Sequence, residues 1–299
     1  MPLFRARGFG MDWQADTALS QFDPLPASPD APDITVSRVS QLANRMSPRP
    51  INRGEVFDNG FRFGWKDEVT FDVFGGDRIE YCPGTGWRDE LPATFYSTVT
   101  GLTLAWRGFL SFHATALEIS GRAILLAGPA GAGKSTLAAE LMQAGARLLS
   151  DDLTVLGMGN DGMPPIAFRG RQAMRLHPAT AMAIDTLRCE SAPDDPRGKL
   201  LVWPRMRHSG DGLPVAGLIL LGDAEGPLPG RKLAPILPRL LFRPAWTAAI
   251  PGRVASRTQL LELALRMPAR RLLRISGFTA ADRSRRIDAA LAAIAAMAS

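Results

Sequence analysis

The sequence predicts an α/β fold, in which a small β-rich unit precedes a larger unit that alternates strands and helices. Residues 62–82 alternate apolar and polar side chains around a Gly-Gly-Asp turn, which is typical of a hairpin of antiparallel strands. Residues 123–142 pass from an apolar run through a glycine-rich loop into strong helix formers, which predicts a buried strand, a loop and a helix. Further apolar runs at 147–150 and 215–221 predict additional buried strands.

Three segments are expected along the chain. Residues 1–54 include a stretch rich in Pro and Asp, which disfavours helix and central strand, so we expect an extended or partly disordered arm. Residues 55–110 form the small β-rich unit and end in a helix. Residues 111–299 form the larger unit, whose last third is mostly helical and closes with an amphipathic helix from about Ala280.

Composition limits the classes of partner. Of the 299 residues, 46% are hydrophobic and 21% are charged, which is ordinary for a globular protein, and the net charge of +6 suits phosphate ligands or an acidic partner. Neither an aromatic RNA-binding signature nor zinc-ligand spacing occurs, so no nucleic-acid partner is expected. Two isolated cysteines, the lack of a membrane-length apolar stretch and an N-terminus unlike a secretory signal predict a cytoplasmic protein without a membrane partner.

The glycine-rich loop at 128–135 is a complete Walker A motif, G-x-x-x-x-G-K-[ST]. Its glycines let backbone N–H groups approach phosphate oxygens, and the following helix adds its positive N-terminal end. Lys134 can reach the β- and γ-phosphates, and Ser135 can bind Mg²⁺. The alternative, a chance glycine-rich turn, does not explain why strand and helix flank the loop. The expected nucleotide-binding residues are Gly128, Ala130, Gly131, Ala132, Gly133, Lys134, Ser135 and Thr136.

Two carboxylates, Asp151 and Asp152, follow the predicted strand at 147–150. In phosphoryl transfer one carboxylate can hold Mg²⁺ while another accepts or orients the hydroxyl proton of the acceptor. Adjacent residues of a straight strand point to opposite faces, so the two are expected to differ in task. A solvated strand end is the alternative, and the position after the Walker A helix favours a functional pair.

The three histidines differ in their surroundings. His113 precedes the Walker A strand on a neighbouring extended segment, where it can contact the γ-phosphate or the acceptor; a structural histidine is the alternative. His177 and His208 have no partners at metal-ligand spacing and are interpreted as structural.

Taken in order, residues 113–119, 125–137 and 143–152 resemble the histidine-containing strand, the P-loop and the aspartate pair of the HPr kinase/phosphorylase family. The strong match covers 113–156, and a weaker one runs to about 275. The resemblance implies a P-loop kinase domain of HPr-kinase type behind the small N-terminal β-rich unit. It also implies an ATP-dependent serine kinase with ATP and Mg²⁺ as cofactors.

Carried over residue by residue, the resemblance gives each polar side chain a role. Asp151 is the catalytic base toward a serine hydroxyl, and His113 and Lys134 lie beside the transferred phosphate. Ser135 and Asp152 serve the metal. The acceptor is a peptide or protein that carries a serine, and the ring assemblies of the family imply a homo-oligomer.

The chain also departs from the family. A metal-serving glutamate usually stands two residues before the Arg-Gly segment, and here that position is Ala167. The N-terminal domain of the bifunctional enzymes is not recognisable in 1–112, so the chain is more similar to short, divergent relatives, some of which phosphorylate lasso precursor peptides. The cation that neutralises the transition state is expected among Arg169, Arg175 and Lys199.

Two other function classes stay open. An NTP hydrolase or a small-molecule kinase can use the same loop, with a positioned water or a closed pocket in place of a peptide groove. A catalytically weak, nucleotide-gated binding module fits the lost ligand at Ala167. The sequence leaves ATP, GTP and pyrophosphate open as the phosphate donor.

Overall fold

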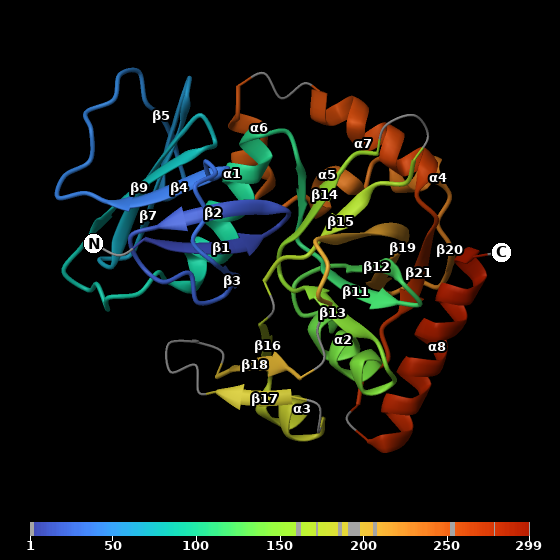
Figure 1. The fold of residues 1–299 in the computed structure, drawn as a ribbon. Helices are drawn as coiled ribbons and strands as arrows, with labels where there is room; N and C mark the ends of the chain where they lie inside the picture. Colours follow the sequence, from blue (N-terminus) through green and yellow to red (C-terminus); the bar gives the residue numbers. More distant parts are fainter. Residues whose placement is uncertain are drawn as a thin grey trace.

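The computed structural model describes residues 3–159, 163–171, 173–184, 187–190, 198–205, 208–251, 255–277 and 279–298. Within these ranges the protein is a mixed α/β structure with two nine-stranded sheets and one three-stranded sheet (Figure 1). The N-terminal sheet lies beside the larger α/β layer structure.

The N-terminal sheet has the strand order β3-β1-β2-β4-β9-β8-β7-β6-β5. The pairs β2–β4 and β4–β9 are parallel, and the remaining pairs are antiparallel. Its strands are β1 (Phe4–Gly8), β2 (Met11–Ala15), β3 (Asp23–Leu25), β4 (Ile34–Arg38), β5 (Arg49–Ile51), β6 (Gly54–Phe57), β7 (Gly60–Trp65), β8 (Val69–Phe74) and β9 (Arg78–Pro83).

The first 54 residues therefore differ from the extended arm that the sequence indicated, because β1 to β5 belong to this sheet. Short alternating segments bury one face of each strand, as Trp13 and Ala15 in β2 and Ile34 and Val36 in β4 show. The segment rich in Pro and Asp holds only the short β3 and the connection to β4.

The core of this sheet is shared with the rest of the chain. The helical segments η1 (Phe95–Val99) and α1 (Thr100–Trp106) cover it with Phe95 and Tyr96, both fully buried. Trp246, far along the sequence, packs its ring 5.8 Å from that of Phe63. The β-rich region is thus anchored to the larger unit by a common hydrophobic cluster.

The second sheet has the order β10-β14-β15-β19-β12-β11-β13, with β21 paired to β19 and β20 paired to β21. The pairs β12–β19 and β19–β21 are parallel. Its strands are β10 (Leu110–Phe112), β11 (Thr115–Ile119), β12 (Arg122–Ala127), β13 (Arg147–Ser150), β14 (Thr154–Gly157), β15 (Ile166–Phe168), β19 (Gly212–Gly222), β20 (Gly226–Pro227) and β21 (Ala269–Leu273).

Helices cover both faces of this sheet (Figure 1). One hydrophobic cluster joins it to α2 and α8, and another joins it to α4, α5 and α7. A small sheet of order β16-β18-β17 lies below with α3. The bounds are α2 (Lys134–Gln143), α3 (Pro178–Met182), α4 (Gly230–Leu233), α5 (Leu237–Leu240), α6 (Pro244–Ala249), α7 (Ala255–Arg266), α8 (Ala280–Ala298), β16 (Met174–Leu176), β17 (Leu187–Glu190) and β18 (Leu200–Pro204).

The expected Walker A strand and helix, the strands at 147–150 and 215–221 and the final helix are all present as β12, α2, β13, β19 and α8. In the described part of the chain, no helix is both long and apolar enough to cross a bilayer. Cys82 carries a free thiol, and the side chain of Cys189 lies outside the described residues.

Candidate functional site

The glycine-rich loop, residues 128–133, connects β12 to α2 as expected. Gly133 caps α2 with a φ of 93°, a left-handed conformation that favours glycine. Lys134 is 8% exposed, and its Nζ donates to the carbonyl oxygens of Gly128 at 3.0 Å and Pro129 at 3.2 Å. Burial lowers the pKa of Lys134, while the charges of Asp151 and Asp152 oppose this shift.

The topology of the sheet brings the acidic pair to this loop. Strand β11 is antiparallel to both β12 and β13, so β12 and β13 run in the same direction. Their carboxyl ends therefore share one edge of the sheet, with the start of β11 between them. Strand β13 ends at Ser150, so Asp151 and Asp152 lie in the turn that follows rather than on a straight strand. Asp152 takes a φ of 68°, which Asp tolerates better than most residues.

The carboxylate of Asp151 lies beside the Walker A serine. Its Oδ1 accepts a hydrogen bond of 2.6 Å from Thr115 Oγ1 and another of 3.4 Å from Ser135 Oγ. Asp151 is only 4% exposed, and burial raises its pKa. A hydroxyl from the first turn of α2 and a buried carboxylate from the turn after β13 thus lie close together.

Asp152 faces the other way, toward His113. His113 Nδ1 lies 3.2 Å from Asp152 Oδ1 and 3.1 Å from the Asp152 carbonyl oxygen. Both side chains are about two-fifths exposed, at 40% for His113 and 41% for Asp152. Burial alone would raise the pKa of Asp152, but the hydrogen bond and charge of His113, with the nearby arginines, outweigh it and lower the pKa.

The structure separates the three cations that the sequence selected. Arg169 is turned away from the acidic pair, because its Nη1 forms an ion pair of 2.6 Å with Asp23. Arg175 lowers the pKa of Asp152 through its charge. Lys199 is close enough to Lys134 for its charge to lower the pKa of that amine.

Arg171, which sequence reasoning did not select, is the cation most deeply buried at this site. It is 3% exposed, and its Nε and Nη2 have no hydrogen-bond partner among the described residues. Its carbonyl oxygen accepts from Asp151 N at 3.4 Å, and its charge acts on both carboxylates. Burial lowers the pKa of Arg171. The only sequence signal was a second arginine two positions after Arg169.

Close packing positions this arginine. The backbone of Gly170 passes so near Phe9 and Ser150 that a Cβ at this position would lie 2.1 Å from the Phe9 ring and 2.4 Å from Ser150 Oγ. Phe9 N donates to the Arg169 carbonyl oxygen at 2.7 Å. The turn between β1 and β2 therefore packs closely against the segment that carries Arg171 and holds it beside the acidic pair.

Two further residues were missed, Thr115 and Arg243. Thr115 holds Asp151, as described above. Arg243 precedes α6 with a φ of 52°, donates to Thr98 Oγ1 at 3.3 Å and interacts with the charge of Asp152. Nothing local in the sequence connects either residue to the loop, because the contacts depend on the assembled sheet.

The family's metal-serving glutamate has no counterpart at its usual place. Ala167 is fully buried in β15, paired with Leu156 and Leu213 inside the sheet. Among the described residues, no group of three or more His, Cys, Asp or Glu side chains could hold a metal ion. Any cation here would be held by Ser135 and Asp151 together with ligand oxygens.

The loop residues Gly131, Ala132, Gly133 and Thr136 also line a pocket of about 260 Å³. His177, interpreted from the sequence as structural, lies on its wall. His208 Nδ1, by contrast, lies within hydrogen-bond distance of Glu118 Oε2, at 2.9 Å, and neither residue lines this pocket.

The chain was compared with known proteins. No protein-family model matches the sequence, and the search of curated proteins finds no match. Among solved structures it is similar to the Hpr(Ser) kinase/phosphatase from Coxiella burnetii, with 12% sequence identity and a TM-score of 0.33 over 63% of this chain and 99% of that one. Since this overall likeness is weak, the function proposed below rests on the residues of this chain.

Proposed function

We propose that the protein is an ATP-dependent serine kinase of HPr-kinase type, which transfers the γ-phosphate to a serine hydroxyl of a peptide or protein. One observation carries the proposal: the Walker A hydroxyl of Ser135 lies 3.4 Å from the carboxylate of Asp151, with Asp152 and His113 at the open side. Phosphoryl transfer needs this set, a phosphate-binding loop, a metal-binding hydroxyl and carboxylate, and a second carboxylate for the acceptor.

The residues fit a magnesium ion. Mg²⁺ is usually held by one or two protein oxygens together with phosphate oxygens and waters, which Ser135 and Asp151 would complete. The carboxylate of Asp151 is buried and its hydrogen-bond partners are the hydroxyls of Thr115 and Ser135, so a cation beside Ser135 would add to the favourable charge that Arg171 already provides. When bound, the ion neutralises charge that develops on the phosphates.

The resemblance implied that Asp151 is the catalytic base and that Asp152 serves the metal, and we propose the reverse division. Asp151 is enclosed beside Ser135, whereas Asp152 is 41% exposed and can meet an incoming hydroxyl. The serine oxygen attacks the γ-phosphorus, the bond from that phosphorus to the bridging oxygen breaks, ADP leaves, and the serine proton passes to Asp152. His113 fixes the orientation of that carboxylate.

Cations around the acidic pair support transfer of a highly charged group. Arg171, Arg175 and Arg243 all interact with the charge of Asp152. Arg171 has two guanidinium nitrogens without partners among the described residues, which a phosphoryl oxygen would satisfy. We assign to it the role for which the sequence analysis named Arg169, Arg175 and Lys199 as candidates.

The half-exposed position of Asp152 and His113 favours an acceptor that reaches the site from solvent, such as a serine on a peptide. The resemblance to short relatives makes a lasso precursor peptide one acceptor to test and an HPr-like protein another.

The direct test mixes γ-labelled ATP and Mg²⁺ with each acceptor, beside a reaction without acceptor. Label on a serine is the expected result. Release of free phosphate alone would favour the hydrolase, and ATP binding without either product would favour the nucleotide-gated binding module.

Two variants separate the roles of the aspartates. Asp152→Asn should retain ATP binding and the wild-type Mg²⁺ dependence but reduce transfer by about 10²–10⁴-fold, the usual contribution of a general base. Asp151→Asn should instead raise the Mg²⁺ concentration needed for half-maximal transfer. If Asp152→Asn transferred phosphate at the wild-type rate, the proposed division would be wrong and Asp151 would be the base.

A further inference from the structure

A short backbone pairing brings Arg243 to the open side of the acidic pair. His113 N donates to the carbonyl oxygen of Leu240 at 2.8 Å, and the ring of His113 lies 6.1 Å from that of Phe242. Arg243 follows directly, so it stands on the side of the site where His113 and Asp152 are partly exposed. The charge of Asp152 acts on its guanidinium.

A second arginine, Arg53, reaches the same place from the N-terminal sheet. It lies in the turn between β5 and β6. The next residue, Gly54, packs so closely against Trp246 that a Cβ there would lie 2.9 Å from the indole ring. Trp246 belongs to α6, the helix that follows Arg243. The charge of Arg53 accordingly acts on Arg243, as the charge of Asp152 does.

The two arginines have no carboxylate bound to them. Arg53 is exposed, and its guanidinium lies 5.0 Å from the centre of the Trp65 ring, which orients the cation and leaves its charge in place. Arg243 donates to a hydroxyl, Thr98 Oγ1, at 3.3 Å. Within the described ranges, neither arginine takes part in an ion pair. Neighbouring guanidinium groups of this kind are suited to bind a carboxylate from a partner.

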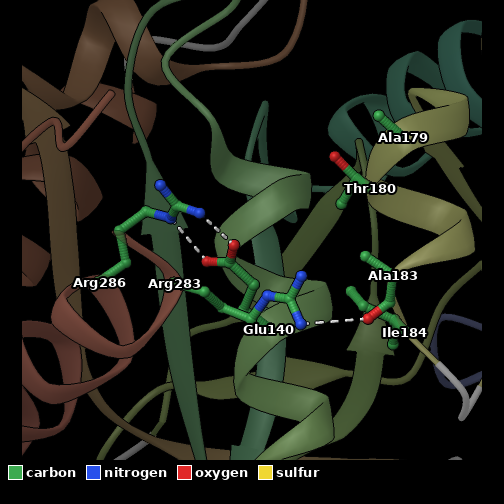
Figure 2. A pocket seen from close by; sticks show the side chains of 7 residues that line it. All are labelled: Glu140, Ala179, Thr180, Ala183, Ile184, Arg283 and Arg286. Carbon is green, nitrogen blue, oxygen red and sulfur yellow. Dashed lines mark hydrogen bonds and ion pairs between the residues drawn. The ribbon is translucent and has the colours of Figure 1, made fainter. Parts of the chain in front are cut away.

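The arginines between α2, α3 and α8 are used differently (Figure 2). Arg286 of α8 binds both carboxylate oxygens of Glu140 in α2, at 2.8 and 2.5 Å, and Arg283 donates to the Ala183 carbonyl oxygen at 3.3 Å. The pocket that these residues line measures only about 30 Å³. These side chains connect helices to one another, whereas Arg53 and Arg243 bind no acid of the protein and border the entrance of the acceptor.

We propose that Arg53 and Arg243 select an acidic acceptor, a segment with an aspartate or glutamate within a few positions of the serine that receives the phosphate. The inference rests on the proposed function and adds the class of acceptor to it. An arginine binds a carboxylate through two parallel N–H donors. Because an extended chain advances only about 3.3–3.6 Å per residue, the acidic residue must stand near the serine in sequence to meet these arginines while the hydroxyl lies at Asp152.

The test measures kcat and KM of the full chain with γ-labelled ATP, Mg²⁺ and pairs of otherwise uncharged serine peptides. One peptide of each pair carries Glu and the other Gln, at one position between about three residues before the serine and about three after it. At the best position, wild type should show a kcat/KM about tenfold higher for Glu than for Gln, which corresponds to about 1.4 kcal/mol. Arg53→Gln should reduce this preference at least about threefold by raising KM for the Glu peptide, since one of the two cations is lost.

The matched control is Arg78→Gln. Arg78 is also an exposed arginine over a ring of the N-terminal sheet, 4.2 Å from the centre of Phe74. The register of β7 and β8 places Trp65 and Phe74 at opposite ends of this strand pair, so the control should retain the wild-type preference for Glu.

Three results would overturn the acidic acceptor while leaving the kinase intact. The first is equal kcat/KM for Glu and Gln peptides at every position in wild type, and the second is an equal loss of preference in Arg53→Gln and Arg78→Gln. The third is label on a protein acceptor but on no peptide, because acidic residues near the serine would then not select the acceptor. Label on neither peptides nor proteins would overturn the proposed function itself.

Discussion

Two buried clusters of arginine and aspartate, one in each half of the molecule, differ in how their polar atoms are satisfied. In the N-terminal sheet, Asp72 is fully buried and both of its carboxylate oxygens accept from guanidinium groups, those of Arg45 and Arg62. At the candidate site, Arg171 is almost as buried, yet two of its nitrogens have no partner among the described residues. Among the described residues, the first cluster satisfies both oxygens of its carboxylate and leaves one guanidinium nitrogen, Arg62 Nε, without a partner, whereas the second leaves two nitrogens of Arg171 without one.

The remaining contacts of Arg45 strengthen the contrast. Its Nη2 donates to Asn59 Oδ1 at 2.6 Å, its Nη1 donates to the Val73 carbonyl oxygen at 3.1 Å, and the guanidinium lies 3.9 Å from the centre of the Phe57 ring. A buried charge that is unsatisfied costs free energy that folding alone does not recover. The Asp72 carboxylate, whose two oxygens both accept from arginines, therefore indicates a structural role, and Arg171, with two unpartnered nitrogens beside the acidic pair, indicates a place for a ligand.

The largest effect is expected at the cluster of Asp72, Arg45 and Arg62. Asp72→Asn removes the charge that compensates Arg45 and Arg62, so the free energy of unfolding should fall by about 3–5 kcal/mol. Urea denaturation measures the loss. ATP binding of the folded variant should match wild type, since the cluster lies in the N-terminal sheet. If the free energy of unfolding fell by less than about 1 kcal/mol, the usual contribution of an exposed ion pair, the Asp72 cluster would be no more stabilising than a surface pair.

In contrast to Asp72→Asn, Arg171→Met should reduce phosphoryl transfer more than stability. Transfer should fall by about 10²–10³-fold, as when one donor to a developing oxyanion is removed. Stability should fall much less than in Asp72→Asn, because Met removes a buried guanidinium that has two nitrogens without partners among the described residues. Paired measurements of transfer rate and urea denaturation test both halves of this expectation.

Arg169→Met is the matched control for that variant. It removes a neighbouring arginine that already has a partner, Asp23, so transfer should persist. If Arg169→Met abolished transfer and Arg171→Met did not, Arg169, one of the three candidates from the sequence, would be the cation and the assignment of Arg171 would be wrong.

These cases also show what the sequence could and could not predict. The glycine-rich loop, its helix and the strand before the acidic pair are local patterns, and each lies where the sequence indicated. The N-terminal strands were missed because the stretch rich in Pro and Asp between β2 and β4 indicated an extended arm, while the parallel pair β2–β4 joins segments about twenty residues apart. Arg171 was missed because its importance comes from burial in the assembled fold, where its neighbour Gly170 packs against Phe9 from a distant part of the chain.

An exposed ion pair between Arg7 and Asp211 joins the two halves of the molecule, and its loss is expected to have the smallest effect on stability. Arg7 of β1 binds both carboxylate oxygens of Asp211, at 3.0 and 2.8 Å, and the Asp211 side chain is 56% exposed. Asp211→Asn should lower the free energy of unfolding by only about 0.5 kcal/mol, because solvent screens the pair.

The effect of this pair should also depend on pH. The hydrogen bond from Arg7 lowers the pKa of Asp211 below its unfolded value. The stabilisation that the charge of Asp211 provides is therefore fully present above the unfolded pKa of this carboxyl and is lost as the pH falls through its folded pKa. The difference in Tm between wild type and Asp211→Asn should be measurable at pH 7 and should vanish well below the folded pKa. A difference that persisted under strongly acidic conditions would show that Asp211 acts through packing rather than charge.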